Sequence, residues 1–306
     1  KVSTARMAAV RSQITDACHI TEPENGNDGN VFVHVIDGTG EFSCTPNDLT
    51  YLVLHASTRP SSYSVVGIMG CQSGGKSTLL NLLFGTKFQE MDSSLGRSQT
   101  TKGVWMDSGC KKRDLVIMDL EGTDSGERGE DRTTFERQTS LYALAVAEVL
   151  LINMWEHDIG RYTASNYGIL KTVFEVNLQL FDSQNKTILM FVIRDHVEDD
   201  TPFSQIVTKL GREVEKIWSE IRKPEKFSQT TVQQLFELKF VALPHMKLQK
   251  QQFIEKVDQL RLKFIDPNHS EYLFASDSHG KKSVPADGFG VYMEQCWTAI
   301  QKNKEL

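Results

Sequence analysis

The chain has 306 residues, of which 39% are hydrophobic and 24% are charged, the composition of an ordinary globular protein. Its 40 acidic residues outnumber 34 basic ones, and the resulting formal charge of −6 argues against a general nucleic-acid-binding protein, because no basic surplus is available to neutralise phosphates. Five scattered cysteines without a Cys-x-x-Cys pair argue against a disulfide or zinc framework and favour a reducing, cytosolic setting.

Apolar and polar residues alternate along the chain in the manner of an α/β domain. Strands are predicted at Val31–Ile36, Tyr63–Met69, Leu115–Met118, Val149–Met154, Thr187–Ile193 and Leu238–Leu243, and helices at Ser77–Phe84, Thr134–Ala147, Thr163–Phe181, 206–221 and 253–264. Short apolar strands alternating with helices predict a mostly parallel central sheet with helices on both faces. Ligands of such sheets bind beyond the carboxyl ends of the strands.

Three segments are distinguished by composition. Residues 1–30 show little periodicity and are expected to be flexible or loosely packed, residues 31–290 form the α/β domain, and residues 291–306 begin a further helix. The most apolar stretch, Leu141–Trp155, contains Glu148 and is too short for the roughly 30 Å of a bilayer core, so we expect no membrane crossing by this chain itself. Neither does the N-terminus resemble a signal peptide, and a first residue Lys1 is consistent with a fragment of a longer protein.

A phosphate-binding loop follows the second predicted strand. Residues Gly70–Ser77 read GCQSGGKS and satisfy the G-x-x-x-x-G-K-[ST] pattern in full. Its small residues let backbone N–H groups turn toward an anion, and the following helix adds its N-terminal dipole. The pattern assigns Lys76 to the β- and γ-phosphates and the Ser77 hydroxyl to Mg²⁺. We therefore predict a nucleoside triphosphate site built on Gly70, Gln72, Ser73, Gly74, Gly75, Lys76, Ser77 and Thr78.

Two further segments complete the expected phosphate side. Asp119-Leu120-Glu121-Gly122 follows a buried strand, where Asp119 can hold Mg²⁺ through a water and the Gly122 N–H can meet the γ-phosphate. The polar loop Gly96–Gly103 contains two adjacent threonines, either of which could supply a second hydroxyl ligand for Mg²⁺. Taken alone, a Thr-Thr pair is also ordinary turn chemistry.

The base-reading element is not the Asn-Lys-x-Asp tetrad of small GTPases. At the corresponding strand end stands Arg194-Asp195-His196, where the Asp195 carboxylate can accept the N1–H and exocyclic amine of guanine but would repel the unprotonated N1 of adenine. Arg194 can lay its guanidinium and stem along the base. Guanine is therefore favoured over adenine. His196 is interpreted as a loop histidine, and His157 with Asp158 as a structural cap.

With these motifs in place, the chain resembles the Root Hair Defective family of dynamin-like GTPases, which includes the yeast Sey-type proteins and comprises functional counterparts of animal atlastins. The similarity runs from about Val35 to the C-terminus. Its most specific segments are Glu90–Asp92, Gly96–Met106, Met118–Asp124, Glu127–Asp131, Leu151–Arg161, Leu170–Phe174, Pro285–Phe289 and Lys302–Leu306.

The resemblance implies a cellular role that the residues alone do not show. Members hydrolyse GTP, dimerise across the nucleotide face, fuse endoplasmic reticulum membranes homotypically and carry the GTPase domain on the cytosolic side. In the family a helical bundle and a membrane hairpin follow the GTPase domain. Residues 291–306 would then lead toward that bundle, and the chain would be the isolated GTPase domain.

The resemblance also assigns residues. It makes Arg194 and Asp195 the guanine-reading pair and Thr101 the threonine for Mg²⁺ and γ-phosphate. Plant relatives carry Pro and Ser at positions 71 and 74, where this chain has Cys71 and Gly74. In atlastins a catalytic arginine stands in the loop at the position of Ser73. Dynamins have a serine there, as this chain does. The transition-state charge would then come from a monovalent cation near Ser73, which we favour, or from Arg97, with Gln72 and Ser73 positioning the water or the cation.

Two other functions remain open at this point. A soluble GTPase of the guanylate-binding type shares part of the Gly96–Met106 segment, although Leu151–Arg161 and Lys302–Leu306 favour the fusion branch. The second is a nucleotide-gated binding module that scarcely hydrolyses GTP. The absence of an arginine from the phosphate loop keeps this function open.

Overall fold

The computed structural model describes residues 30–57, 62–90, 101–109, 114–122, 132–160, 168, 170, 171, 173–175, 178, 186–274 and 284–302. Strands are β1 (Phe32–Ile36), β2 (Ser64–Gly70), β3 (Val104–Asp107), β4 (Leu115–Leu120), β5 (Val149–Trp155), β6 (Thr187–Arg194) and β7 (Phe236–Leu243). Helices are α2 (Pro46–Ala56), α3 (Lys76–Phe84), α4 (Arg132–Val146), α6 (Phe203–Glu220), α7 (Val232–Leu235), α8 (Lys250–Ile265) and α9 (Ala286–Lys302), with short 3-10 turns η2 (Glu156–Asp158) and η3 (Glu225–Phe227).

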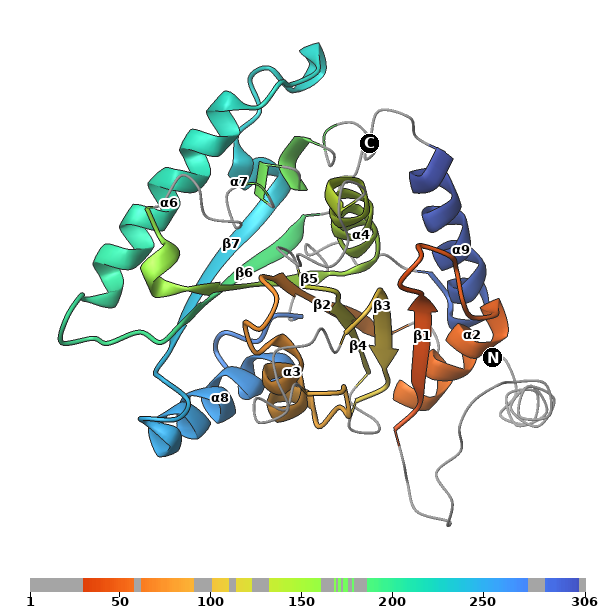
Figure 1. The fold of residues 1–306 in the computed structure, drawn as a ribbon, viewed down its shortest axis with the longest axis horizontal. Coiled ribbons are helices and arrows are strands. Elements are labelled where there is room, and N and C mark those ends of the chain that lie inside the picture. The colour runs from red at the N-terminus through yellow and green to blue at the C-terminus, as the bar shows by residue number, and fades with distance from the viewer. Residues whose placement is uncertain are drawn as a thin grey trace.

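A single seven-stranded sheet organises the described residues, in the order β1-β3-β4-β2-β5-β6-β7 (Figure 1). Neighbours from β4 to β7 pair in parallel, and β3 runs antiparallel to both β1 and β4. The predicted mostly parallel sheet is therefore confirmed. Each predicted strand is present, with its bounds shifted by a few residues.

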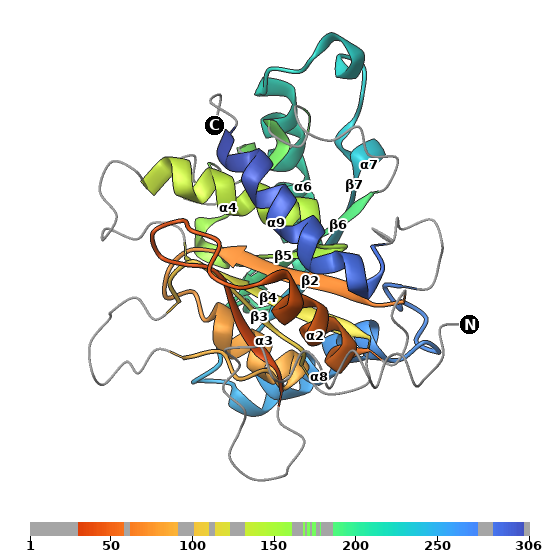
Figure 2. The same cartoon turned by 90° about the vertical axis from the view of Figure 1, so that its right-hand side faces the viewer.

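Helices cover both faces of this sheet, as predicted. Figure 2 shows α4 and α9 on one side and α3 and α8 on the other. The two faces carry separate cores because strand side chains alternate: Val116 and Met118 of β4 pack with the α4 side, whereas Leu115 and Ile117 pack with the α3 side. Both cores are closed to water, which fixes the register of the strands and hence the positions of their ends.

Besides the short 3-10 turns, three elements were not expected from the sequence: helices α2 and α7 and strand β3. The helix α2 is opened by a capping box in which the Thr45 hydroxyl accepts from the Asp48 N–H while Asp48 accepts from the Thr45 N–H, and Pro46 occupies its first turn. Strand β3 has only four residues and follows the polar loop directly. Of the helix predicted at Thr163–Phe181, the described residues are helical, and Leu170, Val173, Phe174 and Leu178 are buried.

The last helix belongs to the packed domain. The predicted boundary between residues 290 and 291 falls inside α9, which begins at Ala286 and packs along α2 and α4. Trp297 is 1% exposed, donates its indole N–H to the Gly40 carbonyl at 2.9 Å and meets Tyr142 edge to face at 5.5 Å. No helix among the described residues has both the length and the apolarity needed to cross a bilayer.

We expect Trp297→Ala to lower the free energy of unfolding by about 3–5 kcal/mol, the usual cost of removing a fully buried tryptophan side chain. The measurement is urea unfolding followed by circular dichroism. The matched control is Val291→Ala on the same helix, whose side chain is 45% exposed and whose loss should cost within about 0.5 kcal/mol. Equal, small effects for both variants would show that α9 folds apart from the rest of the domain.

Candidate functional site

The carboxyl ends of the parallel strands bring the predicted site residues to one edge of the sheet. Strand β2 ends at Gly70, and α3 starts at Lys76 after Gly75, which has a left-handed φ of 72°. A Cβ on Gly70 would lie 2.2 Å from the Asn153 carbonyl oxygen, so only glycine lets the loop leave the sheet there. The loop therefore closes against β5 immediately after its strand.

The side chain of Lys76 folds back over the phosphate loop. Its side chain is 6% exposed, and its ammonium donates to the carbonyls of Gly70 and Cys71 at 3.2 Å each. Burial lowers the pKa of Lys76, and the negative charge of Asp119 acts in the opposite direction. A buried cation with only neutral acceptors gains most from an anionic ligand, because the ligand replaces weak hydrogen bonds by charge-assisted ones.

Three side chains from three elements meet beside Lys76. The Ser77 hydroxyl donates to Asp119 Oδ2 at 2.6 Å, and the Thr101 hydroxyl lies 3.3 Å from both Asp119 Oδ2 and the Ser77 hydroxyl. Burial raises the pKa of Asp119, and Lys76 and the two hydroxyls oppose that shift. Asp119 Oδ1 is buried without a hydrogen-bond partner among the described residues. These oxygen donors suit Mg²⁺, and the unpaired oxygen fits a position meant for the ion or its water.

Gly122 contacts the loop from the far side. A Cβ on Gly122 would lie 2.5 Å from Gln72 Cα and 2.9 Å from the Lys76 ammonium nitrogen. The preceding residue, Glu121, exchanges two hydrogen bonds with Gly103: its N–H donates to the Gly103 carbonyl at 2.8 Å, and its carboxylate accepts the Gly103 N–H at 2.6 Å. The turn after β4 is thus fastened both to the phosphate loop and to the segment that carries Thr101.

We expect Gly122→Ala to lower the affinity for GTP about tenfold or more, because the added methyl displaces the loop backbone and overpacking costs about 1–3 kcal/mol. Titration calorimetry with GTP and Mg²⁺ measures the effect. Gly211→Ala is the control, since nothing lies within 4 Å of a Cβ added at Gly211 in α6. Unchanged affinity in Gly122→Ala would mean that this turn moves freely with respect to the loop.

The remaining predicted phosphate-side residues have mixed positions. A cavity of about 720 Å³ lies over the phosphate loop, and Gln72, Ser73 and Thr78 line it. Ser73 is exposed and has a left-handed φ of 59°, an uncommon conformation for a residue other than glycine. The Thr78 hydroxyl donates to Glu90 at 2.7 Å. Arg97 lies outside the described residues.

The far end of this cavity offers groups for a base. Asp195 has a left-handed φ of 61°, and its carboxylate lines the cavity beside Trp155 and His245. His245 Nδ1 accepts the N–H groups of Lys247 and Leu248 at 3.1 and 3.2 Å, so the ring proton is on Nε2, which lies 3.7 Å from Asp195 Oδ2. The carboxylate therefore faces a fixed hydrogen-bond donor on one side and the open cavity on the other.

Arg194 directs its guanidinium at the phosphate loop. Its side chain is 3% exposed, and Nη1 donates to the carbonyls of Gly74 and Gly75 at 3.2 and 3.4 Å and to Asn153 Oδ1 at 3.2 Å. Arg194 also lines the cavity over the phosphate loop, so contact of its stem with a base stays a prediction, while its guanidinium is directed at the loop carbonyls.

Asn153 and His245 belong to the site but are absent from the sequence-based prediction. Asn153 interrupts the apolar run of β5 and is 2% exposed, with its amide donating to the Gly74 carbonyl at 2.9 Å. An amide within a buried strand is a signal that could have been noticed. His245 follows Pro244 after β7, and no local pattern distinguishes it from an ordinary loop histidine.

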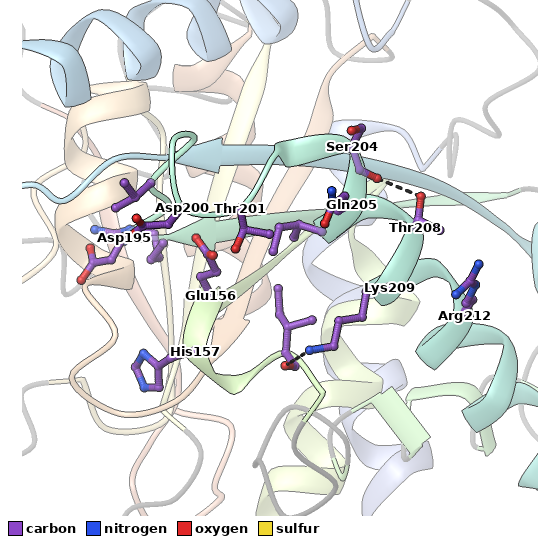
Figure 3. Close-up of a pocket in the computed structure, with 14 residues that line it drawn as sticks. Glu156, His157, Asp195, Asp200, Thr201, Ser204, Gln205, Thr208, Lys209 and Arg212 are labelled. Carbon is purple, nitrogen blue, oxygen red and sulfur yellow. Dashed lines mark hydrogen bonds between the residues drawn. The ribbon is translucent and has the colours of Figure 1, made fainter.

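A second cavity, of about 840 Å³, opens on the other side of Asp195 (Figure 3). Lys209 and Arg212 of α6 line it opposite Glu156 and Asp200, and none of its lining residues comes from the phosphate loop. Lys209 is held by the Ile159 carbonyl at 2.8 Å. The cavity over Gly70–Ser77, which the phosphate loop lines, is therefore the candidate nucleotide site.

The two histidines of this region have structural contacts. His196 is buried between the carboxylates of Glu156 and Glu198, at 2.7 and 2.9 Å, and so connects η2 to the start of α6. His157 is exposed, with Nε2 3.5 Å from Asp158. Neither ring lines the cavity over the phosphate loop.

Comparison with known proteins also indicates a GTP-binding domain. Residues 69–306 match the family model described as the Root hair defective 3 GTP-binding protein (RHD3) GTPase domain. The chain is 44% identical over 283 residues to Protein SEY1 homolog 2 of Entamoeba dispar, which covers 90% of this chain and 34% of that protein. It is 44% identical over 291 residues to Protein SEY1 of Yarrowia lipolytica, covering 90% and 30% respectively.

A plant relative is similar to the same degree. Protein ROOT HAIR DEFECTIVE 3 homolog 1 of Oryza sativa subsp. japonica is 47% identical over 276 residues, which is 90% of this chain and 32% of that protein. The chain thus spans about a third of the length of these curated relatives. Among solved structures, bacterial selenocysteine-specific elongation factor EF-Sec aligns with a TM-score of 0.34 and 13% identity over 65% of this chain and 29% of that chain, too low a likeness to bear on the fold.

Proposed function

Since the chain belongs to the Root hair defective 3 (RHD3) GTPase-domain family and is a GTPase, we propose that it couples GTP hydrolysis to homodimerisation and to homotypic fusion of endoplasmic reticulum membranes. The observation that carries the hydrolytic part is the cluster of Ser77, Thr101 and Asp119 beside the buried Lys76. The membrane part depends on family resemblance.

Each residue of the cluster has a chemical task in this proposal. Ser77 and Thr101 would hold Mg²⁺ through their hydroxyls and Asp119 would do so through a water, and the ion would supply positive charge to the phosphate oxygens. Lys76 exchanges its two carbonyl partners for β- and γ-phosphate oxygens. The Gly122 N–H meets the γ-phosphate, and backbone N–H groups of Gly70 and Gln72–Thr78 surround the other oxygens. Asp195 accepts from guanine.

The transition-state charge is assigned to a monovalent cation held near Ser73, with Gln72 helping to position the attacking water. Ser73 supports this proposal because it is exposed, lines the cavity and has a left-handed φ of 59°, so a cation beside it could contact both protein and phosphate. Arg97 is the alternative source.

Single-turnover hydrolysis of GTP in potassium and in sodium tests the hydrolytic proposal. Stimulation by potassium that is lost in Ser73→Ala supports the cation. Stimulation that disappears instead in Arg97→Ala assigns the charge to Arg97. A rate near zero with either cation, despite tight GTP binding, would contradict hydrolysis by this chain and favour a nucleotide-gated binding module.

The partner and location are proposed on the same basis. A second copy of this chain would bind across the nucleotide face, with membrane contact through a C-terminal region of the longer protein and the GTPase domain on the cytosolic side of the endoplasmic reticulum. Light scattering with GDP, with a non-hydrolysable GTP analogue and with GDP plus aluminium fluoride tests the dimer. A species that stays monomeric in all three states would contradict tethering through this domain.

A further inference from the structure

We propose that Arg194 and Asn153 act together as positioning residues that orient the phosphate loop, so that Arg194 contributes to binding the phosphates rather than to reading the base. The inference deepens the proposed function and depends on the same nucleotide site. The observation that supports it is the direction of two carbonyl groups in the loop.

The carbonyls of Gly74 and Gly75 point at Arg194, and the Gly74 carbonyl also accepts from the Asn153 amide at 2.9 Å. Each carbonyl shares a planar trans peptide with the next N–H group, which points the opposite way. The N–H groups of Gly75 and Lys76 are therefore turned away from Arg194. An anion-binding loop needs inward N–H groups, and the carbonyls thereby turned outward need donors. Arg194 and Asn153 supply them to the Gly74 carbonyl, whereas the Gly75 carbonyl also accepts from the Leu79 N–H at 3.0 Å.

The donors are fixed from several directions. Arg194 Nη1 also bonds to Asn153 Oδ1 at 3.2 Å, which leaves the Asn153 amide nitrogen free to donate to the loop. The guanidinium carbon lies 5.3 Å from the Phe253 ring and 6.0 Å from the Trp155 ring. With 3% of its side chain exposed, Arg194 has little surface left for a ligand.

The glycines of the loop match this arrangement. A Cβ on Gly74 would lie 2.8 Å from the Asn153 amide nitrogen, and a Cβ on Gly75 would lie 3.3 Å from Arg194 Nη1. In this chain a side chain at either position would press on one of these donors unless that donor shifted. Arg194 ends β6, and the adjacent Asp195 lines the cavity. Two consecutive residues therefore have different tasks: Arg194 supports the loop, and Asp195, with its left-handed φ, recognises the base.

The test compares a ligand that has a base with one that does not. Affinities for GTP and for inorganic tripolyphosphate, both with Mg²⁺, are measured by titration calorimetry on the parent chain, Arg194→Lys and Asp195→Asn. Lysine keeps the charge, but its ammonium ends one bond short of Nη1, the nitrogen that contacts Gly74, Gly75 and Asn153. We expect Arg194→Lys to lower both affinities by the same factor, about 10-fold or more, because hydrogen bonds to a charged group are lost. Asp195→Asn should lower only the affinity for GTP.

Tripolyphosphate affinity that is unchanged in Arg194→Lys while GTP affinity falls would overturn the inference and return Arg194 to the base. A parent chain that binds neither ligand would instead overturn the proposed function, and a parent chain that binds tripolyphosphate but shows no preference for GTP would overturn only the base assignment.

Two further variants separate positioning from stability. Trp297→Phe weakens the core far from the site and should leave tripolyphosphate affinity unchanged, whatever its unfolding free energy. Asn153→Ala is the second positioning variant and applies where Arg194→Lys does not fold: it should lower the affinities for GTP and tripolyphosphate by a common factor. Unchanged tripolyphosphate affinity in a folded Asn153→Ala variant would contradict the inference.

Discussion

Lys76→Met is expected to reduce kcat for GTP hydrolysis by about 10²–10³-fold, the usual effect of removing one preorganised donor to developing charge. Methionine retains most of the buried stem, so the substitution removes the ammonium group without opening a large cavity. Among the described residues, the ammonium donates to two backbone carbonyls at 3.2 Å each, and it can exchange these neutral acceptors for phosphate oxygens.

The same substitution should not destabilise the ligand-free chain. Burial already lowers the pKa of Lys76, which means that the charged form is disfavoured in the folded state and that its replacement relieves a desolvation cost. Urea unfolding without nucleotide, paired with single-turnover hydrolysis, checks both parts. Lys250→Met at the exposed start of α8 is the control and should change neither. An active Lys76→Met variant would show that the loop lysine does not contact the transferred phosphate.

Asp195→Asn is expected to reverse the base preference. The carboxylate accepts two guanine donors, and losing hydrogen bonds of about 1.5–3 kcal/mol each lowers GTP affinity by about 100-fold or more. Xanthine carries a carbonyl where guanine carries the exocyclic amine, so the asparagine amide can donate to it and affinity for xanthosine triphosphate should rise. His245 Nε2, 3.7 Å from the carboxylate, is a donor that can hold the new amide oxygen.

Competition of GTP, xanthosine triphosphate and ATP against a fluorescent nucleotide measures this change. The chemistry of phosphate binding is untouched, so the rate of hydrolysis of bound xanthosine triphosphate in Asp195→Asn should remain within a few-fold of the parent rate with GTP. Equal loss of affinity for all three nucleotides would contradict base recognition by Asp195 and indicate general damage to the site.

The phosphate side of the site could be predicted because its chemistry is local. A phosphate loop lies within eight consecutive residues, and its spacing specifies which backbone groups face the ligand. Asp119 was predicted for a similar reason, since it lies at the carboxyl end of the buried strand β4, and parallel strands end at one edge of the sheet. The structure brings Ser77, Thr101 and Asp119 within 3.3 Å of one another, as that edge requires.

The base side could not be predicted in the same way, because its geometry depends on side-chain direction. The sequence places Arg194 beside Asp195, but it does not show that consecutive residues at the end of β6 point to different places. Asn153, 41 residues earlier, becomes a partner of Arg194 only through the pairing of β5 with β6. Helix α2 was missed although its capping box, from Thr45 to Asp48, stands in the sequence.

The paired hydrogen bonds between Glu121 and Gly103 have a kinetic consequence. They join the threonine side of the magnesium site to the turn that meets the γ-phosphate, so the two segments are expected to respond to phosphate release with one rate constant rather than two. Trp105, two residues from Gly103, donates its indole N–H to the Lys102 carbonyl and stacks on His34 at 3.7 Å. Its fluorescence is therefore expected to report the rate of that response in a stopped-flow instrument, without any added label.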